Sequence, residues 1–224
     1  MLKKIGIIGA GFIGQACTKL FIQAGYQVMI CNSRDKITLF SVASSLGCKV
    51  GSLQETVDFG DIILVAIPFI NYQQLPTDLL SNKIVLDAMN YYPDRDGRIQ
   101  VLDTFQTTTS ELVAKHLYKS KIVKVFNAIL QQDILKDAKP NDKTNRRALP
   151  IAGNDNLAKQ TIFKLIDQVG FDYIDVGKLS ESWRFERAKP AYCVPLNLEQ
   201  LKLALSMADR KTELSHNSWK SYIK

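Results

Sequence analysis

Apolar and polar positions along the chain form short runs of two kinds. Apolar runs rich in β-branched residues predict strands at 3–8, 26–31, 48–51, 61–68, 83–88, 121–126, 149–153 and 171–176. Apolar residues three and four positions apart predict helices at 15–25, 35–46, 52–58, 72–80, 107–117, 157–169, 179–187 and 196–208. Because strands and helices alternate, we expect an α/β fold: a doubly wound, mainly parallel sheet with helices on both faces. The polar stretches 94–106 and 137–147 are predicted to be exposed loops.

The first predicted strand runs directly into a glycine-rich turn, and a helix and a second strand follow. This order within about thirty residues is the context of a dinucleotide fingerprint. Gly9 permits the tight turn, Gly11 lets the backbone approach a pyrophosphate, and Gly14 lets the helix pack against the strand. The N–H groups and the dipole of the helix N-terminus favour phosphate charge. The sequence therefore predicts a Rossmann-type cofactor site that includes Gly9, Gly11, Phe12, Ile13 and Gly14.

The residues after the second strand indicate which dinucleotide binds. An NAD site places Asp or Glu at this strand end to bind the ribose 2′-OH, whereas this chain has Asn32, Ser33 and Arg34, with Lys36 just beyond. Arg34 can pair with a 2′-phosphate, and the two residues before it can donate hydrogen bonds. We therefore expect a preference for NADP(H). The alternative is that Arg34 and Lys36 are ordinary solvated charges.

Ligands of open α/β sheets bind beyond the carboxyl ends of the strands. Further cofactor contacts are therefore expected at the ends of three later strands. They are Ala66, Ile67, Pro68, Asn90, Asn127 and Ala128. For the first of these strands, a proline that merely ends the strand is an equal alternative.

The composition restricts the class of protein. The 224 residues are 46% hydrophobic, and the formal net charge is +7. The basic residues are scattered, so we expect no nucleic-acid partner, and a basic surface also suits an anionic dinucleotide. No apolar run is long enough for a membrane span, and the apolar start is broken by glycines, so neither a membrane segment nor a signal peptide is expected. The four cysteines lack metal-binding spacing, which suits a reducing cytoplasm and predicts no metal site.

Several motifs together resemble the NADP oxidoreductases that depend on coenzyme F420, a deazaflavin. The cytosolic domains of the metalloreductases called six-transmembrane epithelial antigens of prostate are relatives of that family. The resemblance extends over roughly residues 1–180, and its more family-specific element is Lys124-Val125-Phe126-Asn127. The other matching segments are 7–14, 32–34, 65–68, 85–90, 149–153 and 170–177.

The resemblance implies an enzyme that passes a hydride between NADPH and a small-molecule redox acceptor. A flavin or deazaflavin is the expected acceptor, with F420, FMN and FAD as candidate second substrates. Transfer between two such rings needs orientation and exclusion of water more than a protein acid or base, so we name no catalytic side chain. Residues 1–145 are expected to form the NADP-binding domain, and 146–224 a small C-terminal domain or extension that completes the acceptor site. A homodimer is one candidate for the oligomeric state.

The segment 182–193 resembles a bacterial subgroup of the family and departs from the archaeal type, so the identity of the acceptor stays open. Trp183 and Tyr192 are either aromatic walls of the acceptor site or core residues that anchor the last helix. His116 and His216 belong to no motif and are expected to be structural or exposed.

Two other classes of protein fit part of the sequence. A β-hydroxyacid dehydrogenase or an imine reductase begins with a similar fingerprint but needs a long helical C-terminal region, whereas strands here are expected to continue to residue 176. An NADP-binding redox sensor would bind the cofactor without consuming it. Oxidation of NADPH with an added flavin or deazaflavin distinguishes an enzyme from such a sensor.

The substitution Arg34→Ala tests the predicted cofactor preference. A charge-assisted contact to phosphate contributes about 1.5–3 kcal/mol, so NADPH binding is expected to weaken roughly tenfold or more. NADH has no 2′-phosphate, and its binding should change little. Titration calorimetry with both cofactors measures the difference, and an equal loss for the two would contradict the assignment.

Overall fold

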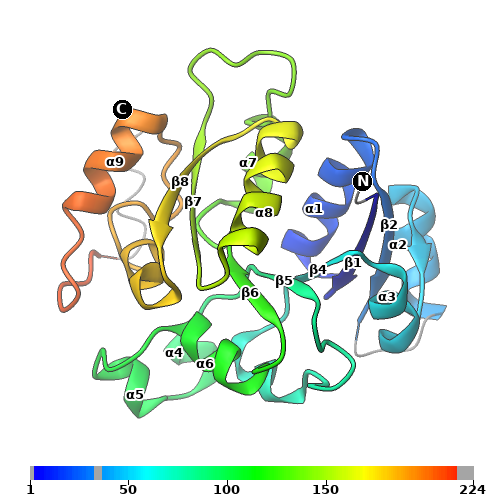
Figure 1. Cartoon of the computed structure of the whole chain (residues 1–224), viewed down its shortest axis with the longest axis horizontal. Coiled ribbons are helices and arrows are strands. Elements are labelled where there is room, and N and C mark those ends of the chain that lie inside the picture. Colours follow the sequence, from blue (N-terminus) through cyan, green and yellow to red (C-terminus); the bar gives the residue numbers. More distant parts are fainter. Residues whose placement is uncertain (1–2, 33–36, 216–224) are drawn as a thin grey trace.

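The computed structural model describes residues 3–32 and 37–215. These residues form one eight-stranded sheet and the helices packed on it (Figure 1). The order across the sheet is β3-β2-β1-β4-β5-β6-β7-β8. The strands are β1 (Lys4–Ile8), β2 (Gln27–Cys31), β3 (Lys49–Val50), β4 (Ile62–Val65), β5 (Ile84–Asp87), β6 (Lys121–Lys124), β7 (Ala148–Gly153) and β8 (Asp172–Gly177). The strand order reverses at β1, which pairs in parallel with both β2 and β4. The predicted doubly wound α/β fold is therefore confirmed.

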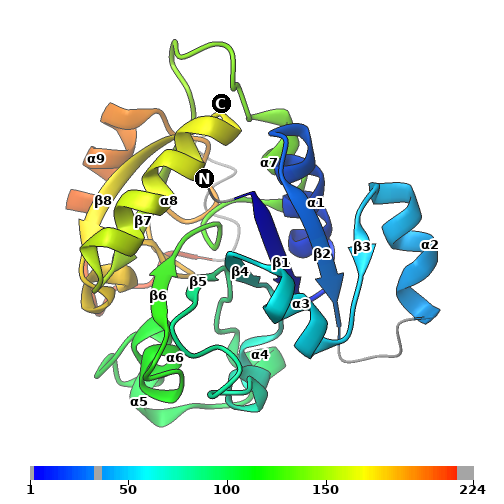
Figure 2. The same ribbon diagram turned by 45° about the vertical axis from the view of Figure 1, so that its right-hand side comes forward.

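Helices cover both faces of the sheet (Figures 1 and 2). On one face, α1 (Phe12–Gln23), α7 (Gln131–Lys136) and α8 (Asn156–Val169) share a hydrophobic cluster with alternate strand residues. On the other, α3 (Leu53–Phe59), the 3₁₀ helix η1 (Phe69–Gln74) and α6 (Thr109–His116) form a second cluster. The remaining helices are α2 (Ile37–Leu46), α4 (Pro93–Asp96), α5 (Gln100–Asp103), η2 (Leu179–Phe185) and α9 (Leu198–Ser206). Within the described ranges, no helix has the length and apolar character needed to cross a membrane.

Local sequence rules account for several helix ends. Ser52 caps α3 by accepting a hydrogen bond from the backbone of Glu55, and the Glu55 side chain accepts one in return. This reciprocal pair is the capping box expected from the spacing of the two residues. At the other end of a helix, Gly170 stops α8 with φ of 102°, a left-handed conformation that glycine adopts without strain.

Two predicted elements are wrong. The helix expected at 72–80 is replaced by η1 followed by turns, because Pro76 lacks an N–H and holds Leu75 in an extended conformation. The loop expected at 94–106 contains the short helices α4 and α5. Pro93 stands at the first position of α4, where its missing N–H would have no helical partner in any case.

The stretch 137–147 has no helix or strand, as expected, but its last residues are not exposed. Arg146 is fully buried, and its guanidinium donates to backbone carbonyls of Lys139, Pro140 and Asp142. It also forms an ion pair with Asp167 at 2.7 Å. The polar sequence predicted an exposed loop. It does not reveal that a charged side chain turns inward and binds carbonyls of its own loop.

The C-terminal strands continue the same sheet. β7 pairs antiparallel with β6, and β8 pairs in parallel with β7. The third hydrophobic cluster fills the space between these two strands and α9. Residues 146–215 thus extend the first part through backbone hydrogen bonds, and the division into domains at residue 145 stays a prediction.

A buried ion pair joins the carboxyl ends of β5 and β6. The side chains of Asp87 and Lys124 are both inaccessible to solvent, and their charged atoms lie 3.1 Å apart. Lys124 Nζ also donates to the Met89 carbonyl at 2.6 Å and to Thr109 Oγ1 at 3.1 Å. Ser110 Oγ donates to the same Asp87 oxygen as the lysine. The pair therefore fixes the backbone just after β5 against the start of α6.

The substitution Lys124→Met leaves the Asp87 carboxylate buried without its cation. Breaking a buried pair in this way destabilises proteins by about 3–5 kcal/mol, so we expect the free energy of unfolding to fall by that amount. The exposed pair Lys119–Asp78 provides the control, because solvent screens its charges and Lys119→Met should change the free energy of unfolding little. Urea unfolding followed by circular dichroism measures both. Equal losses for the two variants would show that the buried pair has no special role.

Candidate functional site

The three fingerprint glycines have different surroundings. Gly9 has φ of 113°, and a Cβ on it would collide with the carbonyl of Ala66. A Cβ on Gly14 would collide with the carbonyl of Gly9, so this glycine allows α1 to lie against the turn. A Cβ on Gly11 would meet nothing within 4 Å. Two glycines are therefore required by the fold itself, whereas the third leaves open space in front of the helix.

A cleft of about 550 Å³ opens at this turn, where the strand order reverses. Its walls come from the ends of β1, β2 and β4 and from α2, α3 and η1. Six residues predicted from the sequence line this one cleft. They are Gly9, Gly11, Asn32, Ala66, Ile67 and Pro68. Apolar side chains that the sequence did not single out complete one wall, namely Leu39, Val42, Leu53 and Leu75.

Other predicted residues lie around the cleft and do not line it. Phe12, the first residue of α1, is 78% exposed. Ile13 packs against the first hydrophobic cluster, and Ala128 is buried in the third. The predicted 2′-phosphate residues Ser33, Arg34 and Lys36 lie outside the described residues, so their role stays a prediction.

Asn90 and Asn127 lie side by side beyond β5 and β6. Asn90 Nδ2 donates to the Asn127 carbonyl at 2.9 Å, and Asn127 Nδ2 donates to Asn90 Oδ1 at 3.3 Å. Asn127 Nδ2 also donates to the Phe185 carbonyl at 3.0 Å. Asn127 is only 2% exposed, yet its Oδ1 has no hydrogen-bond partner. Buried polar atoms are nearly always paired, so this unpaired acceptor is an exception that a ligand N–H group could satisfy.

The backbone just before Asn127 is strained. Phe126 is buried and has φ of 64°, in the left-handed region that bulky residues avoid. Holding a residue there costs about 1–3 kcal/mol and is typical of positions where the chain must aim a side chain. The turn at Phe126 ends the run of β6 and places Asn127 beside Asn90. Nothing in the sequence pattern of this apolar run indicated the strain.

Three titratable side chains that follow the asparagine pair or pack near it are neutral at physiological pH. The Tyr92 and Tyr192 hydroxyls hydrogen-bond to each other, and burial raises the pKa of both. The Cys193 backbone N–H donates to the Ala128 carbonyl, and burial raises the pKa of the Cys193 thiol to about 12. These three groups therefore keep their protons, and the charge next to the pair is that of Arg95, which donates to the Asn90 carbonyl at 2.8 Å.

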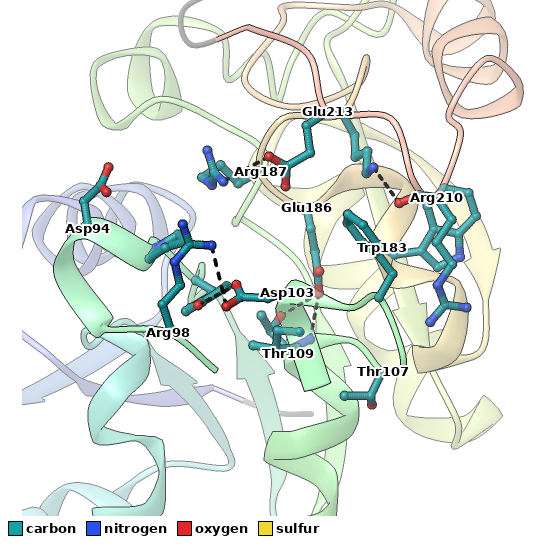
Figure 3. Close-up of a pocket in the computed structure, with 15 residues that line it drawn as sticks. Asp94, Arg98, Asp103, Thr107, Thr109, Trp183, Glu186, Arg187, Arg210 and Glu213 are labelled. Atoms are coloured by element: carbon teal, nitrogen blue, oxygen red, sulfur yellow. Dashed lines mark hydrogen bonds and ion pairs between the residues drawn. The ribbon is translucent and has the colours of Figure 1, made fainter. Parts of the chain in front are cut away.

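A second pocket, of about 320 Å³, lies beside the pair (Figure 3). It is enclosed by the segment after β5, the start of α6, η2 and the segment after α9. Trp183 lines this pocket and is half-buried. Tyr192 packs instead against the third cluster. Trp183 and Tyr192, which were candidates for the same role on sequence grounds, therefore have different surroundings.

The pocket is connected to the buried ion pair. Thr109 Oγ1 accepts from Lys124 and donates to Glu186 Oε1 at 2.6 Å, and the Thr109 backbone N–H donates to the same oxygen at 2.9 Å. Asp87, Lys124 and Glu186 were included in the sequence-based prediction only as parts of motifs and were assigned no role in the site. The available signal was a charged residue at the end of each of two apolar strands, because such a charge is buried only when it is paired.

Comparison with known proteins shows that part of this site is similar to a family. The family model described as NADP oxidoreductase, coenzyme F420-dependent, matches residues 4–91, which include the glycine turn, the cleft and Asn90. The resemblance inferred from the motifs is thereby confirmed, and the matched segment ends before β6 and its Lys124-to-Asn127 element.

The chain is also similar to individual proteins. It is 28% identical over 198 residues to the metalloreductase STEAP3 of Rattus norvegicus. The aligned residues are 86% of this chain and 38% of the rat protein. The solved structure of a hypothetical protein, SMa0349 of Sinorhizobium meliloti, has a TM-score of 0.75 and 28% identity over 88% of this chain and 96% of that one. A candidate F420-dependent NADP reductase of Arthrobacter sp. FB24 has a TM-score of 0.69 and 18% identity over 81% and 87% of the two chains, which shows a shared fold.

The substitution Gly11→Val tests whether the cleft is the phosphate site. The backbone at Gly11 is extended, with φ of −73°, and a Cβ there has open space, so the fold should be retained. NADPH binding should weaken by roughly a hundredfold or more, equivalent to about 2.7 kcal/mol. Gly11→Ala adds a smaller obstacle and should give an intermediate loss. Fluorescence titration measures affinity and circular dichroism checks the fold; a folded valine variant with normal affinity would place the phosphate site elsewhere.

Proposed function

We propose that the protein is an oxidoreductase that binds NADPH in the cleft and passes a hydride to a flavin or deazaflavin bound beyond Asn90 and Asn127. One observation carries this proposal: an open glycine and a buried, unpaired amide oxygen lie along the same carboxyl edge of the sheet. Dinucleotides bind at this edge in doubly wound folds, with the pyrophosphate at the first glycine turn. The family description, which names both NADP and coenzyme F420, supports the same reading.

The first part of the cleft fits the adenosine and pyrophosphate groups of the cofactor. Gly11 caps α1 without a side chain, so the first N–H groups of the helix can approach phosphate oxygens. Leu39, Val42 and Leu53 offer an apolar wall of the kind that holds a flat adenine ring.

The asparagine pair fits the nicotinamide end. Asn127 Oδ1 can accept a hydrogen bond from the carboxamide N–H₂ group of the ring, which supplies the donor that this buried oxygen lacks. Both N–H groups of Asn127 are already used by Asn90 and Phe185, so its amide cannot rotate to present nitrogen instead. The pair therefore fixes which way the amide faces.

The chemistry needs positioning more than proton transfer by the protein. Reduced nicotinamide, when bound, supplies the hydride, and an acceptor ring stacked against it receives that hydride. Lys124 holds the Met89 carbonyl and so fixes the backbone that carries Asn90. Apolar residues of β4 and η1 exclude water from this edge. Holding two rings in a reactive geometry can by itself account for a large share of a rate enhancement.

The proposal is tested by NADPH oxidation with a panel of acceptors: F420, FMN, FAD, riboflavin, ferric chelates and quinones. We expect turnover with at least one flavin or deazaflavin. Binding of NADPH with no oxidation by any acceptor would indicate a redox sensor and contradict the proposed activity.

Asn127→Ala tests the nicotinamide contact. Removing a hydrogen bond of about 1–1.5 kcal/mol should lower turnover with the best acceptor by up to about tenfold. NADPH affinity should change much less, because the adenosine and phosphate contacts remain. Asn156→Ala, at an exposed position in the first turn of α8, is the matched control. Unchanged turnover in Asn127→Ala would remove this residue from the site.

A further inference from the structure

The second pocket contains a cation whose donors are not used by the protein. Arg210 lines the pocket, and its Nε is buried without a hydrogen-bond partner. Its guanidinium lies 5.9 Å from the centre of the Trp183 ring and donates no hydrogen bond to the described part of the chain. A guanidinium has five N–H donors in a planar fork that suits phosphate and carboxylate oxygens. An unused fork at a pocket wall is therefore a binding group.

The other arginines of the pocket have acidic partners. Arg98 lies 3.7 Å from Asp103, and Arg187 lies 3.5 Å from Glu213. Glu186 accepts two hydrogen bonds from Thr109, as described above. Figure 3 shows Arg98 beside Asp103 and Arg187 beside Glu213 in the lining of the pocket. The charges of the lining thus largely compensate one another, and Arg210 is left with its donors available.

The segment that carries Arg210 is held firmly. Lys189 Nζ donates to the carbonyls of Asp209, Arg210 and Thr212 at 2.8, 3.0 and 2.7 Å. The backbone N–H of Leu214 donates to the Ala188 carbonyl. Because the backbone is fixed at several points and the guanidinium lies near the Trp183 ring, less of this segment has to become ordered when a ligand binds.

The pocket also borders the proposed acceptor position. Tyr91, which lines the pocket, follows Asn90 directly in the chain. Glu186, another lining residue, follows Phe185, whose carbonyl accepts from Asn127. Leu102 and Phe105 add apolar contact area to the wall. A molecule with its ring at the asparagine pair can therefore extend a chain into this pocket.

We propose that the pocket binds the anionic tail of the acceptor, a phosphate or carboxylate group carried on a short polar chain, and that Arg210 is the residue that selects it. The proposal rests on the proposed function for the position of the acceptor ring. It adds a substrate class: acceptors with a charged tail, such as FMN, are preferred over the same ring without one, such as riboflavin.

Flavin binding tests this preference without requiring turnover. FMN and riboflavin share a ring and differ in one phosphate, so their dissociation constants, measured by flavin fluorescence with NADP⁺ present, isolate the contribution of the tail. We expect FMN to bind roughly tenfold more tightly in the unaltered protein. In Arg210→Gln the two affinities should become equal, through loss of FMN affinity alone. Arg210→Lys, which keeps the charge but loses the fork, should retain part of the difference.

Arg184→Gln is the matched control. Arg184 also lies over the Trp183 ring, at 4.5 Å, but its donors are used by Glu181 and by the Leu205 carbonyl, and it does not line the pocket. This variant should keep the preference for FMN. Thermal unfolding and NADPH affinity of all variants show whether the fold and the cofactor cleft are intact.

The outcomes separate this inference from the proposed function. Equal affinities for FMN and riboflavin in the unaltered protein, or a preference that survives Arg210→Gln, would overturn the assignment of the pocket even if NADPH is oxidised. Binding of inorganic phosphate that depends on Arg210, together with equal flavin affinities, would show a site for a free anion and would likewise overturn it. A preference for FMN that disappears in Arg210→Gln would support the pocket even if no acceptor oxidised NADPH, the result that contradicts the proposed activity.

Discussion

The carboxyl edge of the sheet depends on one buried pair of charges. Asp87 and Lys124 face each other in register at the ends of β5 and β6, where neither side chain reaches solvent. Taking two charges out of water is costly, and such a pair is tolerated only when further hydrogen bonds satisfy both ions. Here those bonds come from the backbone that leads to Asn90 and from the first residues of α6. The need to satisfy the two ions therefore also fixes the segment that carries Asn90 and the start of α6, both of which border the second pocket.

The strained backbone at Phe126 and the unpaired oxygen of Asn127 are adjacent in the chain. Each lowers stability when considered alone, because one holds a bulky residue in a left-handed conformation and the other leaves an acceptor without a partner. Both place a polar group at the sheet edge. Folded domains usually carry such local conflicts at binding sites, where the ligand supplies what the fold leaves unsatisfied.

Much of the fold follows from local sequence rules. The eight strands have strong apolar patterns, and the glycine turn and the capping box at Ser52 act over a few residues, so the sequence alone locates them. The errors arise where distant contacts decide. Arg146 is buried because it reaches carbonyls in its own loop, and no periodicity reveals that. Likewise, Arg210 becomes part of a pocket only because the segment after α9 folds back toward η2.

The candidate site was predictable to a similar extent. Residues that follow a strand directly could be placed at the carboxyl edge, and the structure brings six of them into one cleft. Contacts that join separate elements, such as Thr109 between Lys124 and Glu186, depend on how α6 and η2 meet and have no signature in either segment. Placement along a strand can thus be inferred from sequence, whereas the partners of a buried side chain require the assembled fold.

The order of the strands also suits growth of the sheet during synthesis. Once β1, β2 and β3 have paired, β4 joins the free edge of β1, and each later strand is added outside the one before it. No strand has to insert between two that are already paired. The chain can therefore fold from its N-terminus as it emerges, with β3 staying at one edge while each later strand covers the other edge.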